Sequence, residues 1–304
     1  MAVIMKKISE LNYDGVPGVK AATKQLAKAI LRKCYLLPKQ QIKRLAGRIY
    51  WGPKELIMNR KINKIAKVKL YKNNKIPKII HYVWLGGGQK PKLTKKYIKT
   101  WRKYCPGYEI IEWNEHNYNV EKNRYAREAY SAQKWAFVAD FIRLDVLDKF
   151  GGIYLDTDVE VLKSFDGLLS NPAFLGFEVS APGSGQIFSG TGTLASEKSG
   201  ELIKYLKAYY APDRSFIQED GSIDTTTNTR TVTRMISEKY GVEFDNDLQK
   251  NKDFVIYPSE YFCPKVWSTR KVLLTKNTFT VHHFAASWLP PEVRDAQHQN
   301  EKKL

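Results

Sequence analysis

Apolar residues recur along this chain with two different spacings, and the change between them divides it. Up to residue 75 they recur every three or four positions among many lysines and arginines, which is typical of amphipathic helices. We expect a helix at residues 19–37 that Pro38 closes, a short basic stretch at 40–48 that stops near Gly52-Pro53, and a third stretch at 54–69. The pattern therefore predicts a basic helical N-terminal segment.

From residue 76 onward, dense β-branched and aromatic runs alternate with helical stretches. Strands are expected at residues 78–85 and 108–113, on either side of a helix at 93–104. A strand, a helix and a strand with short connections predict an open α/β sheet. Further along we expect a long helix that begins near residue 124 or 131 and ends at Phe150, strands at 153–160, 174–179, 254–257 and 278–282, helices at 201–209 and 233–240, and loops at 182–186 and 220–231.

The most informative run is Phe-Gly-Gly-Ile-Tyr-Leu-Asp-Thr-Asp-Val-Glu at residues 150–160. A Gly-Gly turn is expected to end a helix there, and the strand that follows carries Asp156 and Asp158. Because alternate residues of a strand share a face, the two carboxylates can point at one object. Such a pair suits Mg²⁺ or Mn²⁺ with a phosphate as a further ligand. A solvated turn after a strand is the alternative for an Asp-x-Asp sequence taken alone.

The positive charge of the chain is concentrated before residue 76. The 304 residues have a formal net charge of +19. Residues 1–75 hold 19 of the 50 Lys and Arg and only 3 of the 31 Asp and Glu, which gives +16 there and leaves +3 for residues 76–304. This asymmetry predicts two parts, a basic segment at 1–75 and a catalytic domain at 76–304, with separate roles.

Three roles are open for the basic segment. Basic amphipathic helices bind anionic lipid surfaces, where each Lys or Arg contributes about 1 kcal/mol. The helices could instead pack on the catalytic domain and leave their lysines solvated, or they could contact nucleic acid. Few aromatic residues lie among the basic ones, which argues against a base-stacking surface. An anionic membrane surface is therefore a candidate partner, and nucleic acid is not expected.

Cysteine usage and apolar runs bear on the compartment. Cys34, Cys105 and Cys263 are widely spaced and odd in number, which favours reduced thiols over a disulfide framework or a cysteine-based zinc site. No apolar run approaches the roughly 20 residues that span a bilayer, and the first residues lack the apolar core of a secretory signal. We expect a cytoplasmic protein, either free or peripheral at the inner face of the plasma membrane.

Two features before the Asp-x-Asp run suggest a ligand site. Trp84 ends a strand in the run His-Tyr-Val-Trp-Leu-Gly-Gly, and open α/β sheets bind ligands outside the carboxyl ends of their strands. Its ring could stack on a nucleobase or belong to the ordinary core. Asp140 and Arg143 are three residues apart in an otherwise apolar helix, so they share a face. They could form a routine ion pair. Unpaired charge is costly in an apolar helix, however, so a polar pocket is the better explanation for the two charged residues.

The last feature is the run Val-His-His-Phe-Ala-Ala-Ser-Trp at residues 281–288. Imidazole is a reasonable third ligand for Mn²⁺, and a structural or solvated histidine pair is the alternative.

Together these runs resemble glycosyltransferases with a DXD sugar-binding region, the family 32 group that includes bacterial capsular and exopolysaccharide enzymes and yeast-type mannosyltransferases. More remotely, the chain is similar to the glucosyltransferase domain of the large glucosylating bacterial toxins. The resemblance covers about residues 76–290 and is strongest at 77–87 and 135–160. It implies a GT-A fold, that is, a Rossmann-like open sheet with flanking helices, and a metal-dependent, retaining transfer of a hexose from a nucleotide sugar.

The resemblance also implies roles for single residues. Val83 and Trp84 would bind the base of the donor, and Tyr154 would lie beside the donor. Asp140 and Arg143 would contact the sugar hydroxyls. These two residues, with Asp156 and Asp158, would be the catalytic residues. The metal, Mn²⁺ or Mg²⁺, would be held by Asp158 and His283 with help from Asp156, with His282 as the less favoured ligand. Ser287 and Trp288 would contact the diphosphate.

The chain departs from the family pattern at two places. The expected loop at residues 184–193 lacks an asparagine, and residues 225–230 lack a Gly-Pro pair. These departures leave the acceptor open: an oligosaccharide or lipid-linked glycan is expected, with a protein acceptor of the toxin kind as the alternative. A UDP-linked glucose, galactose or N-acetylhexosamine is the expected donor. The alternative outside the enzymes is a basic protein that binds a membrane or nucleic acid and has no catalytic activity.

Overall fold

The computed structural model describes residues 39–68, 74–180 and 186–285. The helix expected at 19–37, and the candidate residues Ser287 and Trp288, lie outside these ranges. The chain divides into two compact units, residues 1–64 with 117–119 and residues 65–116 with 120–304. The expected division into 1–75 and 76–304 stays a prediction.

The described part of the N-terminal segment is one helix, α3 (Lys39–Val68), which contains Pro53. The predicted interruption near Gly52-Pro53 is therefore wrong. Proline has a φ angle that a helix accepts, so the helix can continue through it with the loss of a backbone hydrogen bond, at a cost of about 3 kcal/mol. Within the described residues, no helix combines the length and the apolar character needed to cross a membrane.

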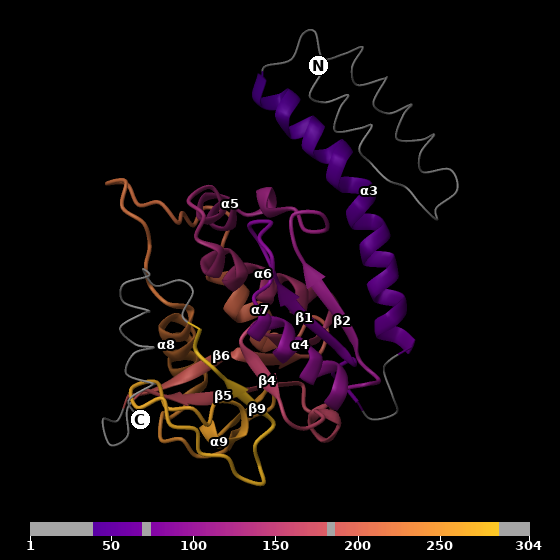
Figure 1. Ribbon diagram of the computed structural model, residues 1–304. Coiled ribbons are helices and arrows are strands. Elements are labelled where there is room, and N and C mark those ends of the chain that lie inside the picture. Colours follow the sequence, from indigo (N-terminus) through magenta and orange to yellow (C-terminus); the bar gives the residue numbers. More distant parts are fainter. Residues whose placement is uncertain (1–38, 69–73, 181–185, 286–304) are drawn as a thin grey trace. The chain divides into compact units, whose positions relative to one another are not determined.

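A mixed seven-stranded sheet organises the larger unit (Figure 1). Its order is β2 (Glu109–Trp113), β1 (Ile79–Val83), β3 (Gly152–Leu155), β6 (Ile187–Ser196), β5 (Ala173–Val179), β8 (Val255–Tyr257) and β7 (Gln249–Lys250). The pairs β1–β2, β1–β3 and β5–β8 are parallel, and the other three are antiparallel. A separate antiparallel pair joins β4 (Val159–Val161) to β9 (Thr280–His282). The predicted α/β class, an open sheet with flanking helices, is confirmed.

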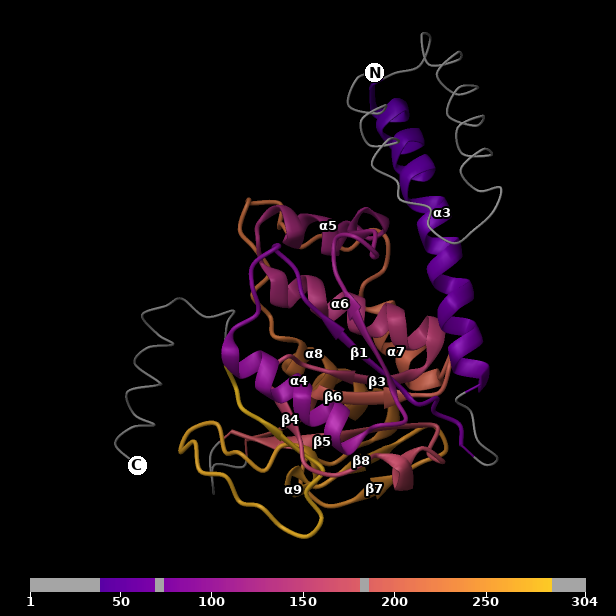
Figure 2. The same cartoon turned by 45° about the vertical axis from the view of Figure 1, so that its right-hand side comes forward.

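Helices cover both faces of this sheet, and Figure 2 shows α4 and α6 on opposite sides of β1 and β3. The helices are α4 (Lys92–Tyr104), α5 (Arg124–Ser131), α6 (Trp135–Phe150), α7 (Glu201–Ala208), α8 (Asn228–Tyr240) and α9 (Ser259–Phe262), with short 3₁₀ turns at Val120–Lys122 and Asp166–Leu168. Side chains alternate along β1, so Ile80 and Tyr82 face the α4 side while His81 faces α6.

The core on the α4 side joins the main sheet to the small one. Trp101 of α4 is fully buried, and its indole N–H donates to the carbonyl of Val159 at 2.7 Å. The members of this core include Ile80, Tyr82, Leu155, Phe165, Phe174, Phe262 and Phe279. Because α4 is tied to the first residue of β4, the turn just before β4 has a fixed position.

Two expectations in the middle of the chain, a helix that begins near residue 124 and a loop around residues 184–193, are wrong. The helix that ends at Phe150 begins at Trp135, close to the alternative start near residue 131, because Gln133 adopts a left-handed φ of 57° between α5 and α6. The stretch expected as a loop around residues 184–193 contains β6, a central strand of the sheet. Its small Gly, Ser and Thr residues do not read as a strand, but they allow close neighbours: a Cβ on Gly190 would lie 3.2 Å from the carbonyl oxygen of Gly176 on β5.

The Asp-x-Asp sequence lies in a turn and not in a strand. β3 ends at Leu155 and β4 begins at Val159, and the amide of Val159 donates to the carbonyl of Asp156 at 3.0 Å. The expected strand at 153–160 is therefore two strands in two sheets. The two aspartates still come together, because the turn reverses the backbone between them.

The entry to β3 requires two glycines and a buried histidine. Gly151 and Gly152 have φ angles of 65° and 112°, and a Cβ on either would come within 2.7 Å of a backbone atom of another strand or loop. His81, fully buried, accepts from the indole N–H of Trp113 at 3.1 Å through Nδ1. Its Nε2 therefore carries the proton and donates to the carbonyl of Gly151 at 2.8 Å. This bond fixes the end of α6 against β1.

Burial lowers the pKa of His81 from 6.5 to about 4, because the charged imidazolium would be taken out of water. The unfolded chain binds this proton near pH 6.5 and the folded chain does not, so folding loses stability as the pH falls from 6.5 toward 4. We expect His81 to account for about 3 kcal/mol of the difference in unfolding free energy between pH 7 and pH 4.

Chemical denaturation of a His81→Gln variant at several pH values tests this, with His116→Gln as the control at an exposed histidine. The His81→Gln variant should be less stable than the wild type at pH 7 and should lose less stability on acidification. Parallel pH curves for the wild type and His81→Gln would contradict the assignment.

Candidate active site

A group of polar side chains of the larger unit lies at the carboxyl ends of β1 and β3. These neighbouring parallel strands pair His81 with Tyr154, and continuation of that register sets Val83 level with Asp156. The amide of Asp156 donates to the carbonyl of Gly192 on β6 at 2.9 Å. The first aspartate is thus held between two strands, at the edge where open α/β sheets bind ligands.

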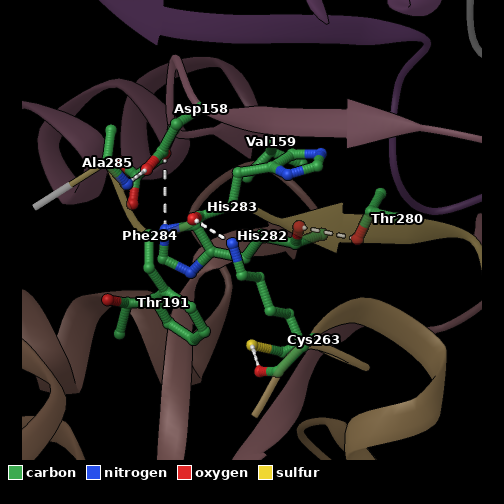
Figure 3. A network of polar contacts seen from close by, with 12 residues as sticks. Asp158, Val159, Thr191, Cys263, Thr280, His282, His283, Phe284 and Ala285 are labelled. Atoms are coloured by element: carbon green, nitrogen blue, oxygen red, sulfur yellow. Dashed lines mark hydrogen bonds and ion pairs between the residues drawn. The ribbon is translucent and has the colours of Figure 1, made fainter. Parts of the chain in front are cut away.

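Asp156, Asp158 and His282 form a cluster that could hold a cation. One ligand atom from each lies within 4.8 Å of the others. β9 delivers the histidine, because β4 and β9 pair in a register that sets Val159 opposite His282. Residues that are far apart in the sequence are therefore neighbours through the small sheet (Figure 3).

Asp158 is the most strongly bound member of this cluster. Its carboxylate lies 3.3 Å from Nε2 of His282 and accepts from the amide of Ala285 at 2.7 Å (Figure 3). Burial alone would raise the pKa of Asp158, but His282 and the backbone amide lower it to about 2. Conversely, burial alone would lower the pKa of His282, and Asp158 raises it well above its usual value. Without a cation the two residues therefore form a buried ion pair.

His283, the histidine favoured from the sequence as a metal ligand, lies elsewhere. Its Nε2 is 2.9 Å from a carboxylate oxygen of Glu160, and its ring stacks on Tyr97 of α4 at 4.5 Å between ring centres. Consecutive residues of β9 point to opposite sides, so only one of the two histidines can face the aspartates. The structure places His282 there, and His282 replaces His283 as the candidate ligand.

Arg143 of α6 connects the cluster to the rest of the sheet. Its guanidinium lies 2.9 Å from a carboxylate oxygen of Asp140 and 3.2 Å from one of Asp156. It also donates to the carbonyl of Thr191 on β6 at 2.8 Å, and its centre lies 4.6 Å above the ring of Tyr154. Tyr154 in turn donates to Asp156 at 3.0 Å. The four residues predicted around the donor sugar are therefore in one network.

The charges in this network are deeply buried. Burial raises the pKa of Asp140, and Arg143 opposes part of that rise. Burial alone would lower the pKa of Arg143, but Asp156, Tyr154 and Asp140 raise it, so the guanidinium stays charged. Asp156, which keeps a quarter of its side chain exposed, is the member that a ligand can reach. Asp140 and Arg143 form an ion pair that extends to Asp156, and their role in a sugar pocket stays a prediction.

Sequence reasoning missed the contribution of β6 and of three polar side chains. A Cβ on Gly192 would lie 3.1 Å from the His282 ring and 3.3 Å from a carboxylate oxygen of Asp156, so only glycine leaves room there. Glu178 and Cys263 lie on the other side of His282. Asn228, buried at the start of α8, lies close enough to Asp140 to lower the pKa of that carboxyl. The Gly/Thr spacing of β6 was the only sequence signal for any of these.

Trp84 lies just beyond β1 and is half-buried. Its indole N–H donates to the carbonyl of Gly88 at 2.7 Å, and the ammonium of Lys90 lies 5.4 Å from the ring. Its backbone amide donates to the carbonyl of Trp113. Val83, directly before it, is buried. The ring of Trp84 is thus fixed at one edge and partly open to solvent, which a stacking partner requires.

The donor set of the cluster fits a divalent cation. Two carboxylates and one imidazole are ligands that Mn²⁺ accepts, and Mg²⁺ accepts the carboxylates readily. Three protein ligands leave coordination positions for water or phosphate oxygens.

A mixed α/β sheet thus carries an Asp-x-Asp turn and a buried Arg–Asp pair at its carboxyl edge. Residues 91–175 match the family described as "Glycosyltransferase sugar-binding region containing DXD motif". The predicted resemblance is confirmed for this region, which includes α4, α6 and both aspartates.

Two relatives have the names of sugar-transferring enzymes. An inositol phosphoceramide mannosyltransferase of Schizosaccharomyces pombe is 30% identical over 129 residues, which are 38% of this chain and 34% of the relative. An uncharacterized glycosyltransferase of Acanthamoeba polyphaga mimivirus is 26% identical over 228 residues, 71% of this chain and 84% of the relative. Both names agree with the glycosyltransferase class predicted from the sequence. Because the chain spans only about a third of the yeast relative, reaction and substrates of the whole protein are matters of proposal.

Solved structures with a similar fold include the PaToxG glycosyltransferase, at 19% identity over 64% of this chain and 80% of that chain. A glycosyltransferase involved in the glycosylation of the major capsid of PBCV-1 is 16% identical over 74% of this chain and all of that chain. Both have a TM-score of 0.40, and no functional argument rests on them.

The different surroundings of the two histidines predict different effects of their removal. We expect His282→Gln to weaken Mn²⁺ binding by tenfold or more, because it changes a ligand beside both aspartates. His283→Gln, the matched control one residue away, should change the affinity by less than threefold, since its ring contacts Glu160 and Tyr97. Titration of each purified variant with Mn²⁺, followed by calorimetry, measures both constants. Equal losses, or a larger loss in His283→Gln, would restore the original assignment.

Proposed function

We propose that this protein is a metal-dependent, retaining glycosyltransferase that moves a hexose from a nucleotide sugar to an oligosaccharide or lipid-linked acceptor. The observation that carries the proposal is the convergence of Asp156, Asp158 and His282 beside the buried Arg143. One half of this site suits a cation with a diphosphate, and the other half suits the hydroxyls of a sugar. Retention is taken from the resemblance to family 32 enzymes.

The residues of the chain divide the work as follows. Arg143 and Asp140 hold the sugar by charge-assisted hydrogen bonds, which fix its orientation before reaction. Asp156 links this pair to the cation site through its bond to Arg143. Asp158, just before β4, and His282, on β9, would hold the cation from the two strands of the small sheet. A bound Mn²⁺ or Mg²⁺ would supply positive charge to the departing diphosphate.

The base of the donor has a candidate platform in Trp84, whose ring is held by Gly88 and flanked by Lys90. Stacking on a Trp face is favourable for any base, so it does not decide between UDP and GDP. UDP-glucose, UDP-galactose and UDP-N-acetylhexosamine are the donors we favour. Because the yeast relative is named a mannosyltransferase, mannose is the next candidate sugar.

The acceptor is proposed to be a glycan or a lipid-linked glycan. The yeast relative is named for a ceramide lipid acceptor, and the basic segment at 1–75 would bring this chain to an anionic membrane surface. That would make the protein peripheral at the cytoplasmic face, in the biosynthesis of a polysaccharide or capsule. Transfer to a protein, as in the toxins, is the second candidate.

Removal of the metal should stop the reaction. Purified protein with a panel of UDP- and GDP-sugars, Mn²⁺ and no acceptor should release the nucleoside diphosphate slowly from one donor. EDTA should abolish this release, and Mn²⁺ should restore it, because the cation neutralises the leaving diphosphate. The Asp158→Asn variant should lose nearly all turnover and its response to Mn²⁺. Asp166→Asn, at an exposed aspartate outside the site, serves as the control. Full activity of Asp158→Asn would end the metal assignment.

The platform role of Trp84 predicts a change in donor binding more than in chemistry. We expect Trp84→Ala to raise the donor KM by about tenfold or more, since base stacking contributes about 1–3 kcal/mol, and to change kcat by less than threefold. Trp84→Phe should recover most of the affinity, because it keeps an aromatic face. Steady-state kinetics on the hydrolysed donor measure both constants. A loss confined to kcat would argue against stacking.

A further inference from the structure

The loop between α9 and β9 exposes three consecutive apolar side chains. In this 264–277 loop, Val272, Leu273 and Leu274 are 42%, 63% and 59% exposed. Elsewhere in the described part of the chain, exposed large apolar residues stand singly in the sequence, as Leu93 and Leu248 do. Single exposed apolar residues are common on proteins, but a contiguous group marks a surface that meets another apolar phase.

The loop is a hydrogen-bonded structure that holds these side chains outward. Lys265 and Val272 form an antiparallel bridge. The amide of Val266 donates to the carbonyl of Lys271 at 2.9 Å, and the amide of Leu273 donates to that of Pro264 at 3.1 Å. Some of the backbone polar groups next to the apolar residues are thus paired within the loop. Each paired group lowers the desolvation cost of bringing the loop to an apolar phase.

Cations surround the apolar triplet. Lys271 and Lys276 flank it in the sequence and are exposed. The ammonium of Lys163, also exposed, donates to the carbonyl of Lys276 at 3.2 Å. No acidic residue occurs in the sequence between Glu260 and Glu292. A two-fold contact between copies of this chain would bring these like charges together, whereas an anionic lipid surface pairs with them.

The loop is joined to the backbone that follows the candidate cation ligand. The guanidinium of Arg270 donates to the carbonyl of Phe284 at 3.0 Å, and Lys265 donates to the carbonyl of His283 at 3.1 Å. These bonds connect the loop to the two residues after His282. A surface that the loop contacts is therefore kept at a set distance from the proposed active site.

We propose that the 264–277 loop docks this protein on an anionic lipid bilayer, with Val272, Leu273 and Leu274 in the headgroup and acyl boundary. Lys163, Lys271 and Lys276 contact the anionic headgroups at the same time. The loop is distinct from the basic segment at 1–75. Docking rests on the proposed function in one respect, because the membrane is where the transferase would meet its acceptor. Its test measures membrane binding alone and does not require catalytic activity.

Flotation of the full chain with vesicles of phosphatidylcholine and phosphatidylserine tests the proposal. The Leu273→Asp/Leu274→Asp variant should bind at least tenfold more weakly than the wild type, because two inserted side chains become charged. The matched control is Ile217→Asp/Leu248→Asp, which changes two exposed apolar residues on other loops, 40% and 53% exposed. It should bind within twofold of the wild type. Lys271→Gln/Lys276→Gln should weaken binding about fivefold for each lysine on these vesicles, and much less on pure phosphatidylcholine.

Unchanged flotation of the Leu273→Asp/Leu274→Asp variant would overturn the proposal and assign membrane binding to residues 1–75. Equal losses in the two aspartate variants would overturn it as well, because net charge alone would then explain both. A loss of dimer mass in light scattering, confined to the loop variant and without a change in flotation, would identify the surface as a contact between copies. Donor hydrolysis, measured in parallel, should be unchanged in all variants. Its absence from the wild type would defeat the proposed function and leave the flotation result standing.

Discussion

The site depends on one buried cation, the guanidinium of Arg143. It holds α6, the end of β3 and the middle of β6 together through Asp140, Asp156 and the carbonyl of Thr191. A charge at this depth persists only if it is paired and hydrogen-bonded. Because the guanidinium of Arg143 has to be paired, its ion pairs also fix the orientation of Asp140 and Asp156. The ion pairs of Arg143 therefore position the polar residues of the site.

The cation cluster is built from both sheets. The main sheet supplies Asp156 and the glycine floor of β6, and the small sheet supplies Asp158 and His282 across the β4–β9 pair. α4 ties the two sheets through Trp101. His282 and Asp158 form an ion pair beside the second carboxylate, that of Asp156. Contacts within the protein thus hold the three candidate ligands close together.

Much of this could be predicted from the sequence. The first strands, the Gly-Gly entry and the α/β class follow from local patterns, because bulky apolar residues favour a strand in any fold. Asp156 and Asp158 do lie close together, but in a turn and not on one face of a strand as the pattern predicted. β6 could not be predicted, because its small Gly, Ser and Thr residues are required by close contacts with neighbouring residues and not by a preference for strands. The choice between His282 and His283 also lay beyond the sequence. It depends on the face of β9, and hence on the register of a pair of strands separated by more than a hundred residues.

The β4–β9 pair has a consequence for the order in which the protein becomes active during its synthesis. Chains grow from the N-terminus at a finite speed, and domains form as their segments emerge. α6, β3 and both aspartates leave the ribosome long before residue 282 does. A nascent chain that has not yet exposed residue 282 therefore lacks one of the three residues of the candidate cation cluster. The cluster is complete only once β9 has paired with β4, which comes late in synthesis.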